Sequence, residues 1–265
     1  LIDYINIVQK NHLVFFNFIT KQWELHSTNL EPFLGSIPFK DIIIEHDTPG
    51  RAKSKYMLSD IGSTMKLQPY LYQKEAINFA LNNKNALIIL PCGSGKSPIG
   101  VGLCAEAYKQ NLITGECLIV VKASLKYQWS KEIEKFSHLK ANIIDTPSKT
   151  GKKKFDKQFE DCKIFIANYE TLKNEKVAEK LKQKNIQLLY ADEIHYCNNY
   201  DSARTKALTE FNYVQYKIGA TATPITNNPS NLFGIFNFID ESLFVDWKNF
   251  SKNFLKYTGY KRPPK

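Results

Sequence analysis

Residues 91–97 form a glycine-rich segment, Pro-Cys-Gly-Ser-Gly-Lys-Ser, whose residue types can bind a polyphosphate. Glycines let successive backbone N–H groups curl around phosphates, a lysine ammonium reaches the terminal phosphates, and a serine hydroxyl can ligate Mg²⁺. The residues expected to hold a nucleotide are Gly93, Ser94, Gly95, Lys96 and Ser97, with Lys96 also catalytic and Ser97 a magnesium ligand. The usual pattern has a further glycine at position 90, where this chain has Leu90, so the loop is a variant. The alternative is a glycine-rich turn with an exposed lysine.

Two carboxylates, Asp192 and Glu193, follow an apolar run about a hundred residues later. Open α/β sheets bind ligands at the carboxyl ends of their strands, where these side chains would emerge. We expect Asp192 to hold Mg²⁺, directly or through water, and Glu193 to orient or deprotonate the attacking water. A second polar segment, Gly-Ala-Thr-Ala-Thr-Pro at 219–224, follows another apolar run. Its hydroxyls, on Thr221 and Thr223, are candidates for sensing the terminal phosphate.

These residues need a scaffold, and short β-branched runs alternate with helical segments from residue 86 onward. That alternation predicts an α/β fold with a mostly parallel sheet flanked by helices. The expected strands are 86–90, 117–121, 141–144, 163–167, 188–191 and 216–219. The expected helices are 70–81, 97–109, 125–136, 177–183 and 202–210.

The N-terminal part of the chain has a different pattern. Strands at 13–18, 22–26 and 41–45 and a short helix near 30–35 predict a small α+β unit over residues 1–47. Residues 48–66 have the composition of a linker, and residues 67–265 are assigned to the nucleotide-binding lobe.

Composition narrows the class of protein. The formal net charge is +10, from 36 basic and 26 acidic residues, which suggests a polyanionic partner. The alternative is that the basic runs, at residues 149–157 and 173–184, are solvated faces or loops. The five cysteines include no Cys-x-x-Cys pair, which argues against a zinc site or a disulfide framework. The apolar runs are too short to cross a bilayer, so we expect no membrane partner. The expected location is intracellular: cytoplasmic or nucleoid-associated in a bacterial or viral setting, or nuclear in a eukaryote.

The phosphate loop, the Asp-Glu-x-His segment at 192–195 and the Thr-Ala-Thr-Pro segment, in this order and spacing, resemble the first RecA-like lobe of superfamily-two helicases and translocases. Further segments resemble the Swi/Snf-type branch. They are Tyr-Gln-Lys-Glu-Ala-Ile at 72–77, the stretch from 120 to Trp129 and on to 136, Ile-Ala-Asn-Tyr-Glu-Thr-Leu at 166–172, and 224–239 with 247–250. The N-terminal unit faintly resembles the substrate-recognition domain of related annealing helicases; the alternative is a generic packing domain.

This resemblance implies an ATP-hydrolysing motor that uses ATP and Mg²⁺ and tracks along nucleic acid, most simply double-stranded DNA. It implies that Gln73 reads adenine and that His195, with Thr221 and Thr223, couples hydrolysis to movement. It also implies that Ser124, Lys126 and Asn168 approach the sugar-phosphate backbone. Helix-end packing is the alternative for these three residues.

The chain also departs from the branch. The amino-acid sequence of its phosphate loop is nearer that of general superfamily-two helicases. Ala222 replaces the central glycine that the branch has between the two threonines, and Lys122 stands where the branch has proline. Two other functions therefore stay open: a strand-separating or restriction-type motor, and a module that binds ATP and DNA with little hydrolysis. The family also has a second RecA-like lobe that supplies an arginine finger. No such lobe follows residue 219, so we expect a fragment of a longer protein, with weak hydrolysis on its own.

Overall fold

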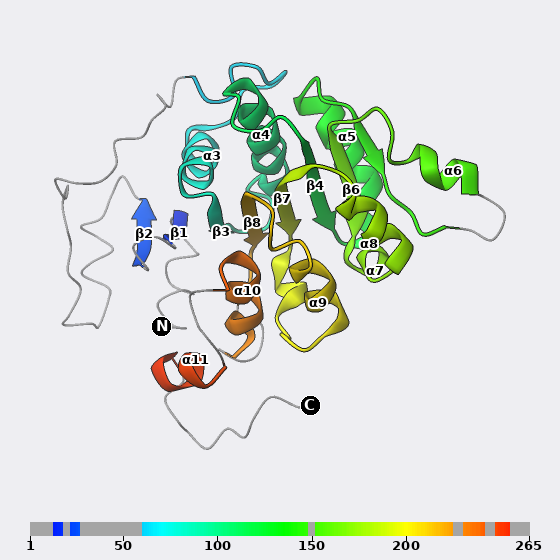
Figure 1. The fold of residues 1–265 in the computed structure, drawn as a ribbon. Helices are drawn as coiled ribbons and strands as arrows, with labels where there is room; N and C mark the ends of the chain where they lie inside the picture. The colour runs from blue at the N-terminus through cyan, green and yellow to red at the C-terminus, as the bar shows by residue number, and fades with distance from the viewer. Residues whose placement is uncertain are drawn as a thin grey trace.

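The computed structural model describes residues 13–17, 22–26, 60–147, 152–224, 230–241 and 247–254. Within these ranges an eight-stranded sheet has the order β2-β1-β3-β8-β7-β4-β6-β5 (Figure 1). The strands from β3 to β5 in this order are all parallel, and β1 and β2 add to the β3 edge in antiparallel fashion. The predicted α/β class with a mostly parallel sheet is therefore confirmed.

The predicted core strands are all present, and their ends differ from the sequence expectation by at most two residues. Their bounds are β3 (Asn85–Ile89), β4 (Glu116–Val121), β5 (Ala141–Ile143), β6 (Ile164–Asn168), β7 (Ile186–Asp192) and β8 (Tyr216–Thr221). Strand β8 comes last in the chain but lies between β3 and β7. This crossover brings the ends of β3, β7 and β8 together, and each is followed by a predicted functional segment.

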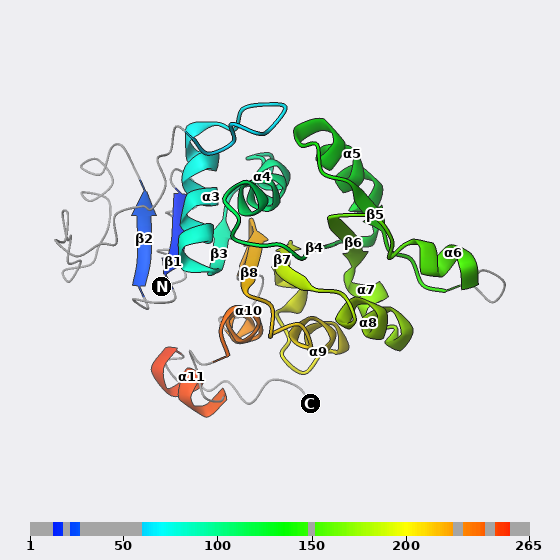
Figure 2. The same ribbon diagram turned by 45° about the horizontal axis from the view of Figure 1, so that its top comes forward.

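Helices cover both faces of the sheet (Figures 1 and 2). One face carries α3 (Leu71–Asn83), α4 (Lys96–Lys109) and α5 (Lys126–Phe136). The other carries α7 (Tyr169–Leu172), α8 (Glu175–Lys182), α9 (Ala203–Thr209) and α10 (Asn231–Ile239), with α11 (Trp247–Phe254) beyond α10. Because successive side chains of a strand point to opposite faces, β3 buries Ile88 toward α3 and α4 and Leu87 toward the other layer.

The five predicted helices are confirmed, but the sequence did not predict α6 (Lys152–Lys157), α7, α10 or α11. Helix α6 is short and rich in lysine, and composition alone assigns such a segment to a loop. Helix α10 is buried almost all round, so its sequence, Asn-Leu-Phe-Gly-Ile-Phe-Asn-Phe-Ile, lacks the polar face that identifies an amphipathic helix.

The N-terminal predictions are described in part. The two strands of the hairpin exist as β1 (Leu13–Asn17) and β2 (Gln22–His26), and β1 pairs with β3. The predicted helix near 30–35 and strand at 41–45 lie outside the described residues, as does most of the linker. Residues 60–66, the described end of that linker, pack against the lobe: Ile61 and Met65 are buried, and the Gly62 N–H donates to Glu106 Oε1 at 2.7 Å. The division at residues 47 and 66 stays a prediction.

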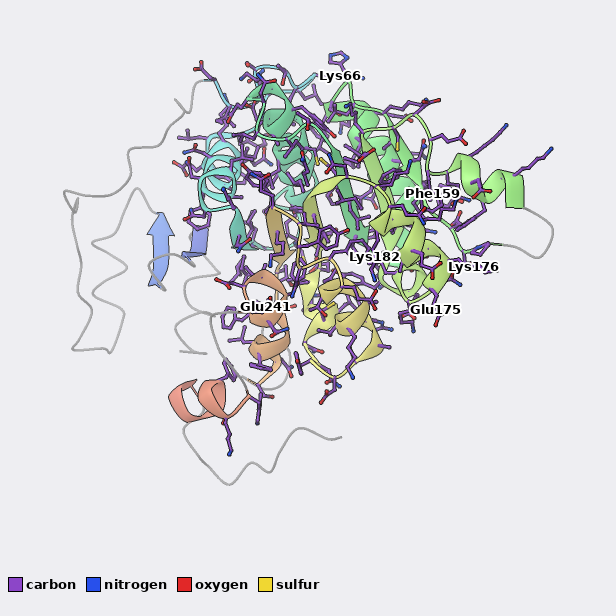
Figure 3. The ribbon with its side chains drawn as sticks, viewed as in Figure 1. Lys66, Phe159, Glu175, Lys176, Lys182 and Glu241 are labelled. Atoms are coloured by element: carbon purple, nitrogen blue, oxygen red, sulfur yellow. The ribbon has the colours of Figure 1, made fainter. Side chains whose placement is uncertain are left out.

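The basic surface is dispersed over several elements. Lys66 lies against the end of α5, where its Nζ donates to the Glu134 carbonyl at 2.7 Å, whereas Lys176 and Lys182 lie on α8 (Figure 3). Several lysines in the basic runs have acidic partners: Lys180 lies 3.0 Å from Asp156, and Lys182 lies 2.6 Å from Glu210. Part of the positive charge of these runs is thus neutralised within the chain.

Candidate active site

The phosphate loop joins the end of β3 to the start of α4, as the sequence predicts. Gly93 and Gly95 have φ angles of 80° and 77°, a region that favours glycine, and Gly95 caps the N-terminus of α4. The first N–H groups of a helix lack intrahelical partners and carry the positive end of its dipole. The loop therefore supplies backbone donors for an anion, with Lys96 and the half-buried Ser97 on the first turn beside it.

Helix α3 holds this loop from one side. Tyr72 Oη donates to the Ser94 carbonyl at 2.9 Å, and Gln73 Nε2 lies 3.4 Å from the same oxygen. Gln73 Oε1 accepts from the Tyr70 N–H at 2.9 Å, so the buried Gln73 amide is engaged at both ends. Glycine suits position 95 because its φ of 77° strains any other residue, and a Cβ there would also lie 2.3 Å from Gln73 Nε2. Gln73 thus lies against the loop, Tyr72 is a contact that the sequence did not single out, and adenine recognition by Gln73 stays a prediction.

The acidic pair stands where β7 ends. Glu193 has a left-handed backbone, with φ 51° and ψ 50°, so the chain turns sharply directly after Asp192. Asp192 is 5% exposed and accepts hydrogen bonds from Trp129 Nε1 at 3.0 Å and from the Glu193 N–H at 3.1 Å. Burial raises the pKa of Asp192 to about 6, the charge of Glu193 adds to the rise, and the hydrogen bond from Trp129 opposes it.

Glu193 faces the phosphate loop. Its Oε1 lies 3.4 Å from Lys96 Nζ, which also lies 3.4 Å from the Leu90 carbonyl oxygen. Burial by itself raises the pKa of Glu193, but the hydrogen bond from His195 and the charge of Lys96 outweigh it and lower the pKa to about 2. At neutral pH Glu193 is therefore a carboxylate that only accepts hydrogen bonds.

Thr221 connects the acidic pair to the end of β8. Its buried hydroxyl donates to Glu193 Oε2 at 3.1 Å, lies 2.8 Å from His195 Nδ1, and accepts from the Thr223 N–H at 3.1 Å. Because the hydroxyl proton goes to Glu193, the short contact to His195 assigns the ring proton to Nδ1. Thr223 contributes its backbone to this network, while its side chain is exposed. The structure thus brings Lys96, Glu193, His195 and Thr221 into one hydrogen-bonded group.

The three candidates for nucleic-acid contact lie in different environments. Ser124 is exposed on a short turn, η1 (Ala123–Leu125), before α5. Lys126 is buried, and its ammonium is paired with the Asp145 carboxylate. Asn168 is also buried, and its Oδ1 accepts from the Thr171 N–H at 2.8 Å as the N-cap of α7. Helix-end packing thus accounts for the Asn168 oxygen. Contact with nucleic acid stays a prediction for Ser124 and Asn168, whereas burial and the ion pair with Asp145 favour the packing alternative for Lys126.

The donors near the loop suit a hard cation. Within the described residues no cluster of three or more His, Cys, Asp and Glu side chains is arranged to hold a metal ion. Magnesium does not need one, because it keeps several waters and takes one or two protein oxygens together with substrate phosphates. The Ser97 hydroxyl and the Asp192 carboxylate are such oxygens, and each hydrogen bond to Asp192 uses a different oxygen and leaves lone pairs free. These residues fit Mg²⁺ held jointly with a nucleotide.

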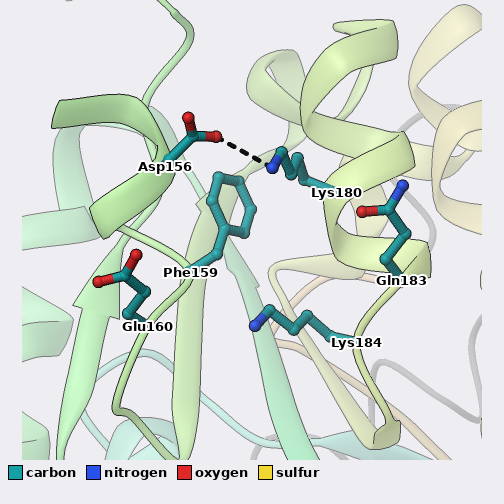
Figure 4. Close-up of a pocket in the computed structure, with 6 residues that line it drawn as sticks. All are labelled: Asp156, Phe159, Glu160, Lys180, Gln183 and Lys184. Carbon is teal, nitrogen blue, oxygen red and sulfur yellow. Dashed lines mark ion pairs between the residues drawn. The ribbon is translucent and has the colours of Figure 1, made fainter. Parts of the chain in front are cut away.

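A hollow at the far edge of the sheet is separate from this group. It has a volume of about 280 Å³ and lies between α6 and α8 (Figure 4). Its lining residues are Asp156, Phe159, Glu160, Lys180, Gln183 and Lys184. Their charges are mixed, and the Asp156–Lys180 ion pair spans the opening, so no one ligand charge is favoured there. None of the predicted site residues lines the hollow.

In the described part of the chain, no helix has the length and apolar content to span a membrane.

The chain is similar in sequence to known proteins. The sequence model of the SNF2-related domain matches residues 52–261. The DNA annealing helicase and endonuclease ZRANB3 of Bos taurus is 27% identical over 197 residues, 71% of this chain and 17% of that protein. A Mycoplasma pneumoniae protein described as an uncharacterized ATP-dependent helicase is 25% identical over 190 residues, 70% of this chain and 18% of that protein. The chain thus spans less than a fifth of the length of these relatives.

Solved structures share the fold. The Sulfolobus solfataricus SWI2/SNF2 ATPase core in complex with dsDNA aligns with a TM-score of 0.60 and 22% identity, covering 72% of this chain and 40% of that one. The SWI2/SNF2 ATPase core domain from the same organism aligns with a TM-score of 0.61 and 23% identity, covering 77% and 41%.

Proposed function

The chain belongs to the SNF2-related family, and on this premise we propose that it is the ATP-binding lobe of a motor that hydrolyses ATP and moves along double-stranded DNA. Membership confirms the resemblance to the Swi/Snf-type branch. The family match spans both the phosphate loop and the Asp-Glu-x-His segment. The DNA part of the proposal draws on the relatives, since ZRANB3 is described as a DNA annealing helicase and the Sulfolobus core was solved with dsDNA.

The observation that carries the proposal is the contact between Lys96 and Glu193. Residues almost a hundred positions apart meet at 3.4 Å, at the mouth of a loop built from left-handed glycines and directly beside Asp192. An ammonium, a carboxylate and a helix N-terminus converging in this way match the parts that phosphoryl transfer to water requires.

Each residue then has a definite task. The backbone N–H groups of the loop would hold the phosphates, and Lys96 would exchange its partners, Glu193 and the Leu90 carbonyl, for phosphate oxygens. Bound Mg²⁺ would neutralise phosphate charge, held by Ser97 and Asp192. Glu193 would orient the attacking water through its carboxylate, because a group with a pKa of about 2 is a weak proton acceptor.

Thr221 and His195 would hold Glu193 in that orientation. Their contacts at 3.1 Å and 3.2 Å both reach Oε2, which leaves Oε1 directed at Lys96. When Lys96 binds phosphate instead, Oε1 becomes the oxygen available to water. We propose that this change of partner links nucleotide occupancy to the residues after β8, where Thr223 donates its N–H to Thr221.

The test is ATP hydrolysis with and without double-stranded DNA. We expect DNA to stimulate hydrolysis by the wild-type chain. Lys96→Ala and Glu193→Gln should abolish the stimulated rate. If the wild-type chain and both variants hydrolyse ATP equally, the assigned residues do not form the active site.

A strand-separating motor is the second candidate function, favoured by the sequence Pro-Cys-Gly-Ser in the phosphate loop. Displacement of a labelled strand from a duplex, compared with displacement of a triplex-forming strand, separates the two activities. Translocation along the duplex predicts triplex displacement without unwinding.

A further inference from the structure

A buried tryptophan contacts the proposed magnesium ligand directly. Trp129 Nε1 donates to Asp192 Oδ2 at 3.0 Å, and Trp129 is 1% exposed. We propose that Trp129 is a positioning residue that fixes the Asp192 carboxylate for Mg²⁺ and ties α5 to the ATP site. This inference rests on the proposed function, because it takes Asp192 as the magnesium ligand.

The hydrogen bonds to Asp192 define the orientation of its carboxylate. Trp129 holds Oδ2, and the Glu193 N–H holds Oδ1 at 3.1 Å. Both oxygens of the carboxylate thus accept a hydrogen bond, one from α5 and one from the residue that follows β7. Partners of this kind orient a metal ligand and tune its affinity, although they never touch the metal.

Trp129 is itself held firmly. Its ring lies 5.6 Å from the Tyr190 ring, at an interplanar angle of 52°. A Cβ on Gly100, in α4, would lie 2.8 Å from Trp129 Cη2 and 2.9 Å from Tyr190 Cε1, so a glycine is required for this packing. Tyr190 Oη in turn donates to the Lys96 carbonyl at 2.9 Å. The two aromatic rings therefore brace the start of α4 and the end of β7 together, which are the two halves of the site.

The residue type is informative. An apolar ring alone fills a core position, and Phe meets that need without a polar atom. A buried indole N–H needs an acceptor, and here the acceptor is the carboxylate that the reaction needs. The same helix begins beside the exposed Ser124 turn, so α5 spans from a predicted nucleic-acid contact to the magnesium ligand.

The experiment compares Trp129→Phe with Trp247→Phe in the 265-residue chain. Trp247 is a matched control because it packs on Phe233 and Phe250, in the opposite layer. Binding of a fluorescent ADP analogue is measured by polarisation, first in EDTA and then over a Mg²⁺ titration. We expect Trp129→Phe to keep the wild-type affinity in EDTA and to need about tenfold more Mg²⁺ for the same gain in binding. Trp247→Phe should follow the wild type in both conditions.

The outcomes separate the two proposals. If the wild-type chain gains no affinity from Mg²⁺, or Asp192→Asn does not reduce the gain, the magnesium assignment fails. If that assignment holds and Trp129→Phe matches the wild type over the Mg²⁺ titration, the positioning role is refuted. Equal weakening in EDTA and in Mg²⁺ also refutes it, because that result indicates packing alone. In the Asp192→Asn background, Trp129→Phe should cause no further change in Mg²⁺ dependence.

A second measurement does not need the Trp129 variant to fold. The chain has three tryptophans, so the indole N–H region of a ¹H–¹⁵N spectrum is simple to assign. Adding Mg²⁺ to the ADP complex should shift the Trp129 indole resonance and leave that of Trp247 in place. An unchanged Trp129 resonance would overturn the proposal.

Discussion

The Thr221 hydroxyl is the centre of the site network, and its removal gives a prediction that can be worked out in detail. Thr221→Val keeps the shape of the side chain and removes one donor and both acceptor lone pairs. All three are in use, toward Glu193, His195 and the Thr223 N–H. Hydrogen bonds that involve a charged group contribute about 1.5–3 kcal/mol, and neutral ones about 1 kcal/mol.

Exposure reduces this sum. The side chains of Glu193 and His195 are 21% and 22% exposed, so water can replace part of what they lose. We therefore expect Thr221→Val to lower the free energy of unfolding by about 2 kcal/mol, measured by urea denaturation. Because Glu193 loses one of the two groups that hold it and His195 loses its own contact with Thr221, DNA-stimulated ATP hydrolysis should fall about a hundredfold. Nucleotide binding should change little, since no contact of Thr221 reaches the phosphate loop side chains.

Thr223→Val is the matched control. The Thr223 side chain is exposed, and its contribution to the network is a backbone N–H that the substitution keeps. Its free energy of unfolding should stay within about 0.5 kcal/mol of the wild type, and hydrolysis should fall less than in Thr221→Val. Equal effects of the two substitutions on stability and turnover would refute the description of this network.

Three further predictions concern the loop, the buried acid and a buried lysine. Gly95→Ala should weaken nucleotide binding, measured by fluorescence titration, more than Gly93→Ala, because both have positive φ but only a Cβ at 95 clashes, 2.3 Å from Gln73 Nε2. In EDTA, wild-type stability should fall between about pH 4 and pH 7 relative to Asp192→Asn, by at most about 3 kcal/mol at 1.36 kcal/mol per pKa unit. Lys126→Met should leave DNA affinity within about twofold, measured by anisotropy, because its ammonium is buried and paired.

The direction of the pH effect follows from linkage. The folded pKa of Asp192, about 6, lies above the ordinary value of 3.8, so the folded chain holds this proton over a range where the unfolded chain has lost it. The stabilisation is complete below about pH 4 and is lost as the pH rises through 6. Parallel pH profiles for the wild type and Asp192→Asn would contradict the burial of the charge.

For Gly95 the contradicting result is equal nucleotide binding by the Gly95→Ala and Gly93→Ala variants. For Lys126 the contradicting result is a large loss of DNA affinity in Lys126→Met.

The sequence predicts the site's ingredients because their chemistry is local. A phosphate loop is a continuous segment, and Asp192 and Glu193 follow a recognisable apolar strand, so each half could be read without the other. The meeting of Lys96 with Glu193 depends on strand order, and β8 lies between β3 and β7 by a crossover that periodicity does not determine.

Other features depend on tertiary partners. The sequence places Trp129 in a segment that resembles the Swi/Snf-type branch, and only the fold shows that its N–H reaches Asp192. The resemblance predicts that Lys126 and Asn168 contact the sugar-phosphate backbone of nucleic acid. Only the fold shows that Lys126 is paired with Asp145 and that Asn168 caps a helix. Helix α10 was not predicted because a helix that is buried almost all round has no polar face to reveal its period.

The central claim is that Lys96 and its surroundings bind the phosphates of ATP together with Mg²⁺. Calorimetric titration of ATP into the wild-type chain and into Lys96→Ala, each with Mg²⁺ and with EDTA, tests it most directly. We predict one ATP bound per wild-type chain, an affinity that rises with Mg²⁺, and a loss of about 10-fold to 100-fold in Lys96→Ala, from the 1.5–3 kcal/mol typical of a charged hydrogen bond. Equal affinities of the two proteins for ATP in Mg²⁺ would contradict the account.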